Sequence, residues 1–212
     1  MISRTLRSIP GKIKDISTVH IALVDDGSTD QTGKIAVGEG VTVLRHVINR
    51  GLGGALKTIF SYAQIYKPDI LVTFDADGQH NGTDLARLIK PILSDSADVV
   101  IGSRWLKRGH APATRRLANK IANIVTYLFF DIKTTDSQSG LRAFNRKALT
   151  SISVVTDGME VSSEILKEVR RMKLRLFEIP IASVYTSYSK AKGQPLVNGI
   201  NVLWQLVVRL LK

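Results

Sequence analysis

The fold is indicated most clearly by one apolar segment that ends in two aspartates, Ile70-Leu71-Val72-Thr73-Phe74-Asp75-Ala76-Asp77-Gly78-Gln79-His80. Its apolar and β-branched residues predict a buried strand, and the glycine after them predicts a turn. Asp75 and Asp77 are two positions apart, so on an extended chain both carboxylates point to one side. Two such carboxylates repel each other unless a cation lies between them, and a hard divalent cation prefers oxygen ligands. From this stretch alone, a metal site and a polar loop capping the next helix both remain open.

Strand-like and helix-like segments alternate around this stretch in the first half of the chain. We expect strands at 19–24, 41–44, 70–74 and 98–101, and helices ending near Val37, Tyr66 and Leu93, with Ser28 or Thr29 capping the first and Thr83 the third. Such alternation predicts an α/β fold with a mostly parallel sheet between helices. Ligands bind such sheets at the carboxyl ends of the strands, where both Asp25-Asp26 and Asp75/Asp77 fall.

The second half of the chain departs from this alternation. A basic segment follows the fourth strand and leads into a helix at 115–130 with one polar face. A loop over 136–144 then enters a short strand, followed by a helix at 160–172 and a strand at 174–179. Residues 197–212 predict a helix whose polar residues form a single stripe. This terminal helix either packs on the domain or lies flat in a membrane interface, and its sequence supports both interpretations.

Composition narrows the classes of partner. The chain has 212 residues, no cysteine and a net charge of +12, so it has no disulfide or thiolate chemistry and favours anionic partners. We find no helix-turn-helix or zinc-finger pattern, and aromatic residues are only 6%, so we expect no nucleic-acid partner. No secretory signal opens the chain, and no apolar run reaches the roughly 20 residues of a spanning helix.

Six short segments carry a resemblance to a known family. They are Val24-Asp25-Asp26-Gly27-Ser28-Thr29-Asp30, Asn49-Arg50-Gly51-Leu52-Gly53, Asp75-Ala76-Asp77-Gly78-Gln79-His80, Gly102-Ser103-Arg104, Asp136-Ser137-Gln138-Ser139-Gly140-Leu141-Arg142-Ala143-Phe144 and Ser189-Lys190. In this order, from about Val19 to Lys212, the chain resembles the family 2 glycosyltransferases of the GT-A fold. The similarity is greatest to the polyprenyl-phosphate sugar synthases, such as the dolichyl-phosphate mannose and glucose synthases. Leu141 stands where that family has a phenylalanine.

The resemblance implies an inverting, metal-dependent transfer of a sugar from a UDP- or GDP-linked donor to a polyprenyl (dolichyl-type) phosphate. It implies one domain over 1–212, with 19–103 binding the nucleotide sugar, 104–195 facing the acceptor and 196–212 forming the amphipathic helix. It also implies roles for individual residues. Mg²⁺ or Mn²⁺ would be bound by Asp75, Asp77 and Gln79, and the donor by Asp25, Asp26, Asn49, Arg50, Gly51, Gly53 and Asp75. Catalysis would depend on Asp77, Arg104 and Arg142, and the acceptor would be bound by Arg115, Arg116, Ser139, Glu164, Ser189 and Lys190.

The chemistry of a phosphate acceptor agrees with these basic residues. A hydroxyl acceptor needs a general base, whereas a lipid phosphate is already ionised and needs cations to position it. Arg104, Arg142 and Lys190 lie in motifs and are our main expectations for that role, with Lys192 as a further basic residue. Arg115 and Arg116 are expected at anionic headgroups. For Glu164, a site role and ordinary pairing on the helix surface with Glu160 both remain open.

The chain also departs from the family it resembles. The family opens with a strand that lies inside the sheet, and nothing in residues 1–18 can form it; Ile2 to Ile9 predicts only a short helix. Either the true start lies upstream or this is a truncated form with a defective nucleotide pocket. Without this strand, open strand edges are expected on both sides of the gap. We expect peripheral attachment to the cytoplasmic face of a membrane. The alternatives are transfer to a saccharide or lipid hydroxyl, a sugar nucleotidyltransferase whose glycine-rich loop is missing here, and an inactive binding homologue.

Overall fold

The computed structural model describes residues 1–106 and 113–182, and their elements follow the order expected from the sequence. These elements are α1 (Ile2–Ser8), β1 (Ala22–Asp25), α2 (Thr32–Gly38), β2 (Thr42–Arg45), α3 (Gly51–Tyr66), β3 (Ile70–Thr73), the 3₁₀ turn η1 (Gly82–Asp84), α4 (Leu85–Leu93), β4 (Val99–Ser103), α5 (Ala113–Phe130), β5 (Arg142–Asn145), α6 (Arg146–Ser151), α7 (Val161–Arg171) and β6 (Leu176–Pro180). The short helix α6 was not expected. The terminal segment 197–212 and Ser189, Lys190 and Lys192 lie outside the described residues.

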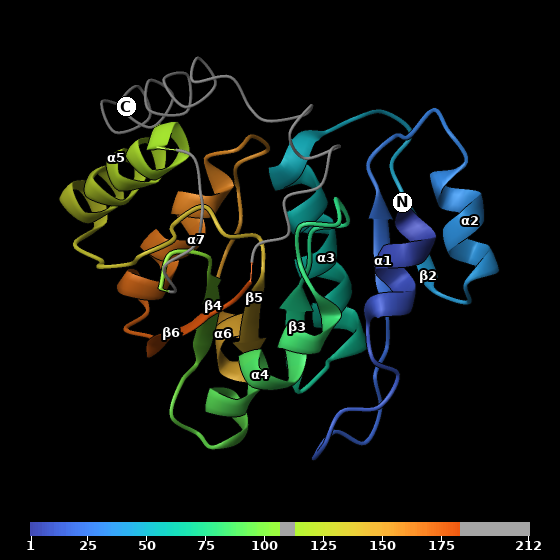
Figure 1. Cartoon of the computed structure of the whole chain (residues 1–212), viewed down its shortest axis with the longest axis horizontal. Helices are drawn as coiled ribbons and strands as arrows, with labels where there is room; N and C mark the ends of the chain where they lie inside the picture. Colours follow the sequence, from blue (N-terminus) through green and yellow to red (C-terminus); the bar gives the residue numbers. More distant parts are fainter. Residues whose placement is uncertain (107–112, 183–212) are drawn as a thin grey trace.

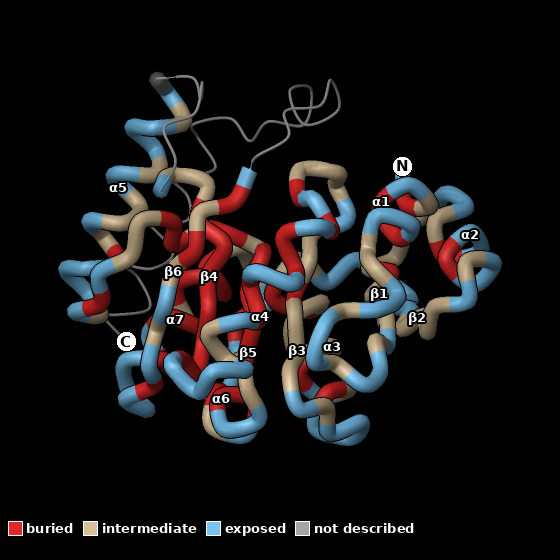
Figure 2. Tube along the Cα trace, turned by 60° about the horizontal axis from the view of Figure 1, so that its bottom comes forward, coloured by how far each residue is buried: buried red, intermediate tan, exposed pale blue. Residues whose placement is uncertain are grey.

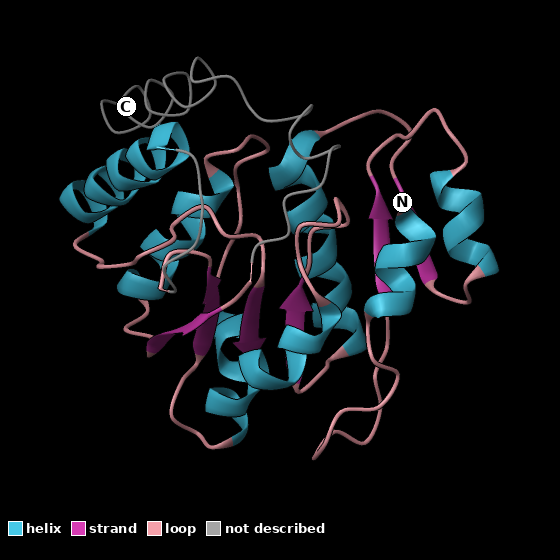
Figure 3. Ribbon diagram, viewed as in Figure 1, coloured by secondary structure: helices cyan, strands magenta, loops and turns pink. Residues whose placement is uncertain are grey.

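The strands form two separate sheets (Figures 1 and 3). β1 and β2 pair in parallel, while the other four strands form a sheet in the order β3-β5-β4-β6. β4 and β6 are parallel, but β5 runs antiparallel to both of its neighbours. The α/β fold class is therefore confirmed, with one central strand reversed. β5 is antiparallel because the loop before it enters the sheet at the end where β3 and β4 finish.

The hydrophobic core lies in the four-stranded sheet. All five residues of β4 are buried, as the red tube in Figure 2 shows. On one side Val99 and Ile101 pack with residues of α3, α6 and α7, and on the other Val100 packs with α4. This double coverage explains why β4 is apolar throughout rather than alternating.

The two-stranded sheet is covered more thinly. The buried core there consists of Ile2 and Leu6 of α1 and Ala36 of α2, with apolar side chains of the two strands and the residues before them partly buried around it. The C-terminal end of α1 reaches the other part of the molecule, because the backbone of Ser8 packs directly against Gly82 of η1. α3 contacts β1 of this sheet as well as α6 and α7 beside the larger one.

The facing edges of the two sheets are open, as expected from the resemblance. Among the described residues, β1 pairs only with β2 and β3 only with β5. Each of these strands therefore has one edge that carries no ladder hydrogen bonds to another described strand.

Two expected helix caps are wrong. The N-cap of α2 is Gln31 rather than Ser28 or Thr29, because the helix begins only at Thr32, after a turn in which Asp25 accepts the N–H of Ser28. Thr83 does not cap α4: a 3₁₀ turn comes first, and Asn81 accepts the N–H of Thr83 at its start. Within the described ranges, none of the helices combines the length and the apolar character that crossing a bilayer requires.

Candidate functional site

The sheet register brings three predicted site residues to one edge. Thr73 at the end of β3 is paired with Arg142 at the start of β5, and Arg142 is also paired with Ile101 near the end of β4. Arg104 directly follows β4, and Asp75 is the second residue after the end of β3. The antiparallel direction of β5 therefore places residues 140–142 beside the loops that carry Asp75 and Arg104.

Gly140 is the point of closest approach between these segments. A Cβ atom at this position would collide with the carboxylate of Asp75, so the contact requires glycine. The Oγ1 of Thr73 donates a hydrogen bond of 2.8 Å to the carbonyl of Gly140 and fixes the same pairing. The Gly140-Leu141-Arg142 segment thus forms one wall of the Asp75 site.

Arg104 is held rigidly by Asp136. The fully buried carboxylate of Asp136 accepts two side-chain hydrogen bonds from Arg104, both of 2.8 Å, and a third from its backbone N–H at 3.0 Å. A bidentate pair of this kind fixes the plane of the guanidinium group. Arg104 is consequently pre-oriented beside the sheet edge.

Arg142 is a buried cation in the same cluster. Its Nη2 donates to the carbonyl of Ser137 at 2.8 Å, whereas its Nε has no hydrogen-bond partner among the described residues. Burial lowers the pKa of Arg142 to about 10, helped by the charge of Arg104 and opposed by Asp136 and Asp75. The guanidinium therefore stays charged at neutral pH, and anion binding by Arg142 stays a prediction.

The carboxylate of Asp75 is stabilised in its ionised form. Its side chain is partly exposed, and its Oδ2 lies 3.5 Å from Nε2 of the buried His80. Burial acts to raise the pKa of Asp75, but the hydrogen bond and charge of His80 and the charges of Arg104 and Arg142 outweigh it, so the pKa lies below its usual range. Asp75 is thus an anion surrounded by cationic side chains.

Asp77 and Gln79 form a tight loop after Asp75. The carboxylate of Asp77 accepts the backbone N–H of Gln79 at 2.9 Å and its side-chain amide at 2.7 Å. Gln79 therefore orients Asp77, and metal ligation by Gln79 itself stays a prediction.

The donor chemistry of this loop suits a divalent cation. No cluster of three or more His, Cys, Asp or Glu side chains occurs among the residues that the structure describes, so the chain would supply mainly the carboxylates of Asp75 and Asp77. Mg²⁺ is commonly bound in this way, by one or two carboxylates with waters and substrate phosphates completing the shell. The residues present therefore fit such an ion.

The aspartates at the end of β1 already have protein partners. Asp25 is buried, accepts the N–H of Ser28 at 2.9 Å and lies 3.7 Å from Arg45. Asp26 accepts hydrogen bonds from His46 Nδ1 at 2.6 Å and from the backbone N–H groups of Arg50 and Gly51, both at 2.8 Å.

These contacts tie Asp26 to the first turn of α3. Burial raises its pKa, but the two N–H groups and His46 outweigh this effect and lower the pKa below its usual value. A carboxylate at this place also complements the positive end of the helix dipole. Contact of Asp25 or Asp26 with a nucleotide stays a prediction.

The glycine-rich turn before α3 packs against another loop. Asn49 accepts the N–H of Gly51 at 3.0 Å. A Cβ on Gly53 would collide with the backbone of Thr156 and Asp157. The carbonyl of Asp157 accepts the N–H of Gly53 at 2.9 Å. We expected these glycines to let a donor approach, and in the structure it is residues 156–157 that approach them.

Glu164 holds the loop that covers this turn. Its carboxylate accepts hydrogen bonds from the backbone N–H groups of Val155 and Thr156, both at 3.0 Å, and from the Thr156 hydroxyl at 2.6 Å. Arg50 lies 3.8 Å from Asp157 of the same loop. These contacts give Glu164 a positioning role, and an acceptor role for it is untested.

The other acceptor-side residues lie in two places. Ser139 is fully buried and its hydroxyl donates to the carbonyl of Gly102 at 2.6 Å. Arg115 and Arg116 lie in the first turn of α5, where Arg116 is exposed. α5 itself is joined to the segment around Asp136, since Asn119 and Asn123 both donate to the carbonyl of Thr135.

Four residues at the two strand ends described above were not assigned a role from the sequence. They are His46, His80, Asp136 and Gly140. Asp136 and Gly140 stand in a quoted motif, and His80 ends another, so attention to charged and small residues inside the motifs would have found them. His46 directly follows β2, and the rule that ligands gather at strand ends points to it.

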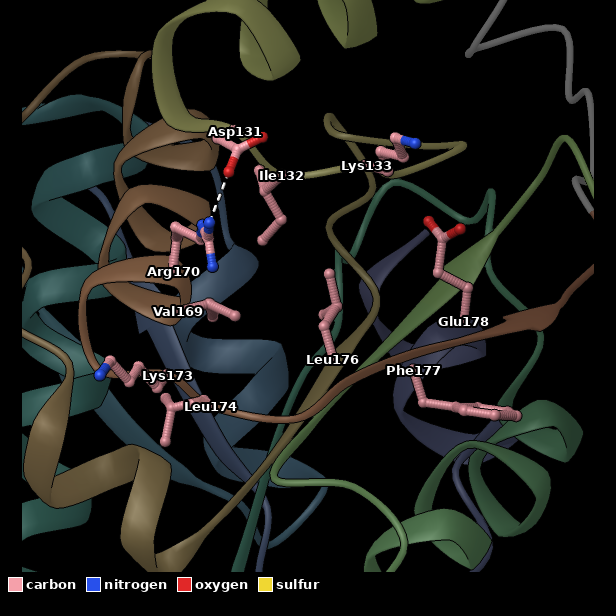
Figure 4. A pocket seen from close by; sticks show the side chains of 10 residues that line it. All are labelled: Asp131, Ile132, Lys133, Val169, Arg170, Lys173, Leu174, Leu176, Phe177 and Glu178. Atoms are coloured by element: carbon pink, nitrogen blue, oxygen red, sulfur yellow. Dashed lines mark hydrogen bonds and ion pairs between the residues drawn. The ribbon is translucent and has the colours of Figure 1, made fainter.

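An open hollow of about 620 Å³ lies elsewhere, between the end of α7, β6 and the segment after α5 (Figure 4). It is lined by charged side chains that include Lys133, Arg170 and Glu178. None of the predicted site residues lines it. Its link to the site is indirect, because Glu178 accepts hydrogen bonds from Thr134 and Thr135 next to Asp136.

Comparisons with known proteins agree with the geometry. A family model described as Glycosyl transferase family 2 matches residues 1–153. The chain is similar to a UDP-N-acetylglucosamine–dolichyl-phosphate N-acetylglucosaminyltransferase of Methanococcus voltae, with 34% identity over 97% of this chain and 90% of that protein. It is 28% identical to an undecaprenyl-phosphate mannosyltransferase of Micrococcus luteus, over 94% of this chain and 92% of that protein. An uncharacterized protein of Methanocaldococcus jannaschii is 42% identical, over 99% of this chain and 86% of that protein.

The fold is also found among solved structures. Glucosyl-3-phosphoglycerate synthase of Mycobacterium tuberculosis, in complex with phosphoglyceric acid, superposes with a TM-score of 0.73 at 22% identity, covering 98% of this chain and 74% of that one. A complex of the same enzyme with Mn²⁺, UDP-glucose and phosphoglyceric acid gives a TM-score of 0.72 at 19% identity, with the same coverage. At these identities the likeness establishes a shared fold.

Proposed function

The chain belongs to glycosyl transferase family 2 and is a glycosyltransferase, and we propose that it transfers a sugar from a nucleotide diphosphate to a polyprenyl phosphate. We further propose that the reaction depends on Mg²⁺ or Mn²⁺ and inverts the configuration at the anomeric carbon. The product is then a polyprenyl phosphate sugar, and the nucleoside diphosphate leaves.

One observation carries this proposal: the carboxylate of Asp75 lies against Gly140, at the point where Arg104 and Arg142 converge. Carboxylates for a cation and arginines for an anion therefore share one sheet edge. A reaction that joins a metal-bound diphosphate sugar to an anionic acceptor needs both kinds of group within reach of one another.

The named relatives support the substrates. The printed names of the Methanococcus voltae and Micrococcus luteus proteins specify a polyprenyl phosphate acceptor, and the first also specifies a UDP-linked donor. A solved structure of the same fold contains Mn²⁺ and UDP-glucose. These names favour a UDP sugar over a GDP sugar for the present chain.

The residues of the chain divide the work between donor and acceptor. Asp75 and Asp77 hold the cation, with Gln79 orienting Asp77. The cation, when bound, neutralises negative charge on the leaving diphosphate. Arg104 and Arg142 bind the acceptor phosphate, and Asp136 keeps Arg104 in its orientation.

With a phosphate acceptor, the reaction does not need a general base to deprotonate the acceptor. The carboxylate of Asp136 is occupied by Arg104, and that of Glu164 by Val155 and Thr156. An ionised phosphate attacks without losing a proton, whereas a hydroxyl acceptor would require such a base. These contacts therefore favour the phosphate over a hydroxyl acceptor.

The acceptor class sets the place of action. A polyprenyl phosphate resides in a membrane, so we propose that the protein works on the cytoplasmic membrane surface as a peripheral enzyme. Its net charge of +12 favours contact with anionic headgroups there.

Donor binding can be tested by thermal shift with UDP and GDP, each with and without Mn²⁺ or Mg²⁺. We expect the melting temperature to rise with UDP only when the metal is present, and Asp77→Ala to abolish the rise. Absence of any metal-dependent shift would contradict the proposed donor site.

Acceptor chemistry needs a second experiment. Transfer of a labelled sugar is measured to a short-chain polyprenyl phosphate and to the matching polyprenol in detergent. We expect product only with the phosphate. Product with the polyprenol alone would instead establish the hydroxyl-acceptor alternative.

A further inference from the structure

Helix α5 has its polar face turned inward. Asn119 and Asn123 point to the body of the protein, where both donate to the carbonyl of Thr135 and Asn123 also accepts the N–H of Ser137. Thr126, on the same side, is buried. An ordinary surface helix buries its apolar face and exposes its polar face, so α5 is reversed.

The outward face of α5 is correspondingly apolar. Leu117, Ile121, Ile124 and Leu128 have exposed fractions between 41% and 71%. They are spaced by four, three and four residues and therefore form one stripe along the helix. In Figure 1 α5 lies at the margin of the molecule, and in Figure 2 its tube is largely in the exposed and intermediate colours. A contiguous exposed stripe of this kind marks an interaction surface.

Aromatic and basic side chains surround the stripe. Tyr127 and Phe129 are exposed near the C-terminal end of α5, and the ammonium group of Lys133 lies 5.7 Å from the centre of the Tyr127 ring. The helix sequence contains Arg115, Arg116 and Lys120 but no aspartate or glutamate. Asp131, the first acid after the helix, is ion-paired with Arg170.

We propose that the outward face of α5 docks on the surface of an anionic lipid bilayer. The stripe would enter the boundary between headgroups and acyl chains, with the aromatic rings and basic residues at headgroup level. The charge of the helix selects this occupant: a second copy would bring the same cations face to face, whereas anionic headgroups complement them.

The position of α5 connects this surface to the site. Its inward face is bonded to Thr135 and Ser137, the two neighbours of Asp136, which holds Arg104. A bilayer under α5 would therefore lie on the acceptor side of the molecule. This inference deepens the proposed function and rests on it for the identity of the lipid that is used.

The test compares two double variants of the full chain. Ile124→Gln with Leu128→Gln removes the centre of the stripe while keeping good helix formers. Val37→Gln with Ile65→Gln is the matched control, because these side chains are also exposed, at 63% and 80%, but lie on α2 and α3. Binding is measured by flotation with vesicles of phosphatidylglycerol and phosphatidylcholine, and with phosphatidylcholine alone.

We expect the parent and the control to float with the anionic vesicles and to bind neutral ones weakly. The α5 variant should partition about a hundredfold less, since it removes two aliphatic side chains from the buried stripe. Equal flotation of the α5 variant and the parent would overturn the proposal.

Two other outcomes would also overturn it, because they assign the face to another occupant. The first is a dimeric parent with a monomeric α5 variant in size-exclusion chromatography without lipid. The second is faster proteolysis of residues 183–212 in the α5 variant without vesicles, which would show that this segment covers the stripe.

Failure of the proposed function is separable from failure of this inference. UDP and Mn²⁺ thermal shifts, and transfer to the short-chain acceptor in detergent, should be the same for both variants and the parent. Loss of those signals in the parent would contradict the function, whereas normal signals with unchanged flotation would contradict the docking surface alone.

Discussion

The two sheets carry similar aspartate pairs after strands β1 and β3, but the pairs have different hydrogen-bond partners and surroundings. At the end of β1, Asp25 and Asp26 accept hydrogen bonds from Ser28, His46 and the start of α3. After β3, Asp77 is bonded within its own loop, and Asp75 faces a cluster of cations. Asp25 and Asp26 are therefore joined to neighbouring segments, while Asp75 lies among cationic side chains, and a ligand role stays a prediction for both pairs.

The burial of the two sheets explains this difference. β4 of the large sheet is wholly buried between two apolar clusters, so this sheet has a large apolar core in addition to its carboxylate contacts. The small sheet has a core of only three buried apolar side chains, among the residues described, and depends on polar contacts. We therefore expect the aspartate pair after β1 to matter more for stability and the pair after β3 more for activity.

Hydrogen exchange should show the largest contrast between the sheets. We expect backbone amides of β1 and β2 to exchange about a thousandfold faster than those of β4, because regions with few buried apolar contacts open at lower free energy than the core. Mass spectrometry of peptides covering 22–25, 42–45 and 99–103 measures this directly. Equal protection would show that the two sheets unfold as one unit.

Removing one carboxylate from each pair should separate activity from stability. Asp77→Asn should lower the transfer rate by about a hundredfold or more, since metal charge stabilisation is worth several kcal/mol and each 1.36 kcal/mol is tenfold. Its melting temperature should barely change. Asp26→Asn should instead lower the free energy of unfolding by about 1–2 kcal/mol, because it loses charge-assisted hydrogen bonds.

Turnover assays and thermal melts of both variants check this pair of expectations. Asp69→Asn, at an exposed position, is the control. A stable, inactive Asp26→Asn protein together with a destabilised Asp77→Asn protein would reverse the assignment of the two pairs.

Glycine substitutions probe the same contrast at two close approaches. Gly140→Ala should displace the Asp75 carboxylate and reduce turnover by about tenfold, because small misplacements of reacting groups are costly. Gly53→Ala should lower the free energy of unfolding by about 1–3 kcal/mol, because its Cβ would meet the backbone of Thr156 and Asp157, as in other overpacked sites. Gly38→Ala, which meets nothing within 4 Å, serves as the control for both measurements. Unchanged turnover in a folded Gly140→Ala protein would contradict the placement of Asp75.

The smallest effect concerns acid stability of the large sheet. Hydrogen bonds from Arg175, together with Asn145 and the charge of Lys147, outweigh the burial of Asp98 and hold its pKa well below the usual range. A carboxylate whose pKa is lowered by folding stabilises the folded protein at pH values above its unfolded-state pKa of about 3.9. This contribution to the free energy of unfolding is lost as the pH falls toward the folded-state pKa.

Asp98→Asn should therefore cost about 1 kcal/mol at pH 7, and the difference from the parent should shrink below about pH 4. Urea unfolding at several pH values measures the difference. A gap that widens in acid would mean that Asp98 is not ionised in the folded protein at neutral pH.

Local patterns anticipated the order of elements and several residues that the structure gathers at one sheet edge. The apolar run before Asp75 predicted β3, and the G-S-R and S-G-L-R segments pointed to Arg104 and Arg142. The direction of β5 was not visible, because strand polarity follows from long-range pairing rather than from the alternation of residues. The caps of α2 and α4 were missed, since serine, threonine and asparagine compete for the same local hydrogen bonds.

Residue patterns alone were enough for the fold class, the family, the two aspartate pairs and the basic residues Arg104 and Arg142. Only the tertiary structure decided which carboxylates are already bound, that Asp136 holds Arg104 across 32 residues and that the polar face of α5 points inward. The reason is physical: propensity and periodicity act over one or two turns of chain, whereas the partner of a buried charge is chosen when distant segments pack together.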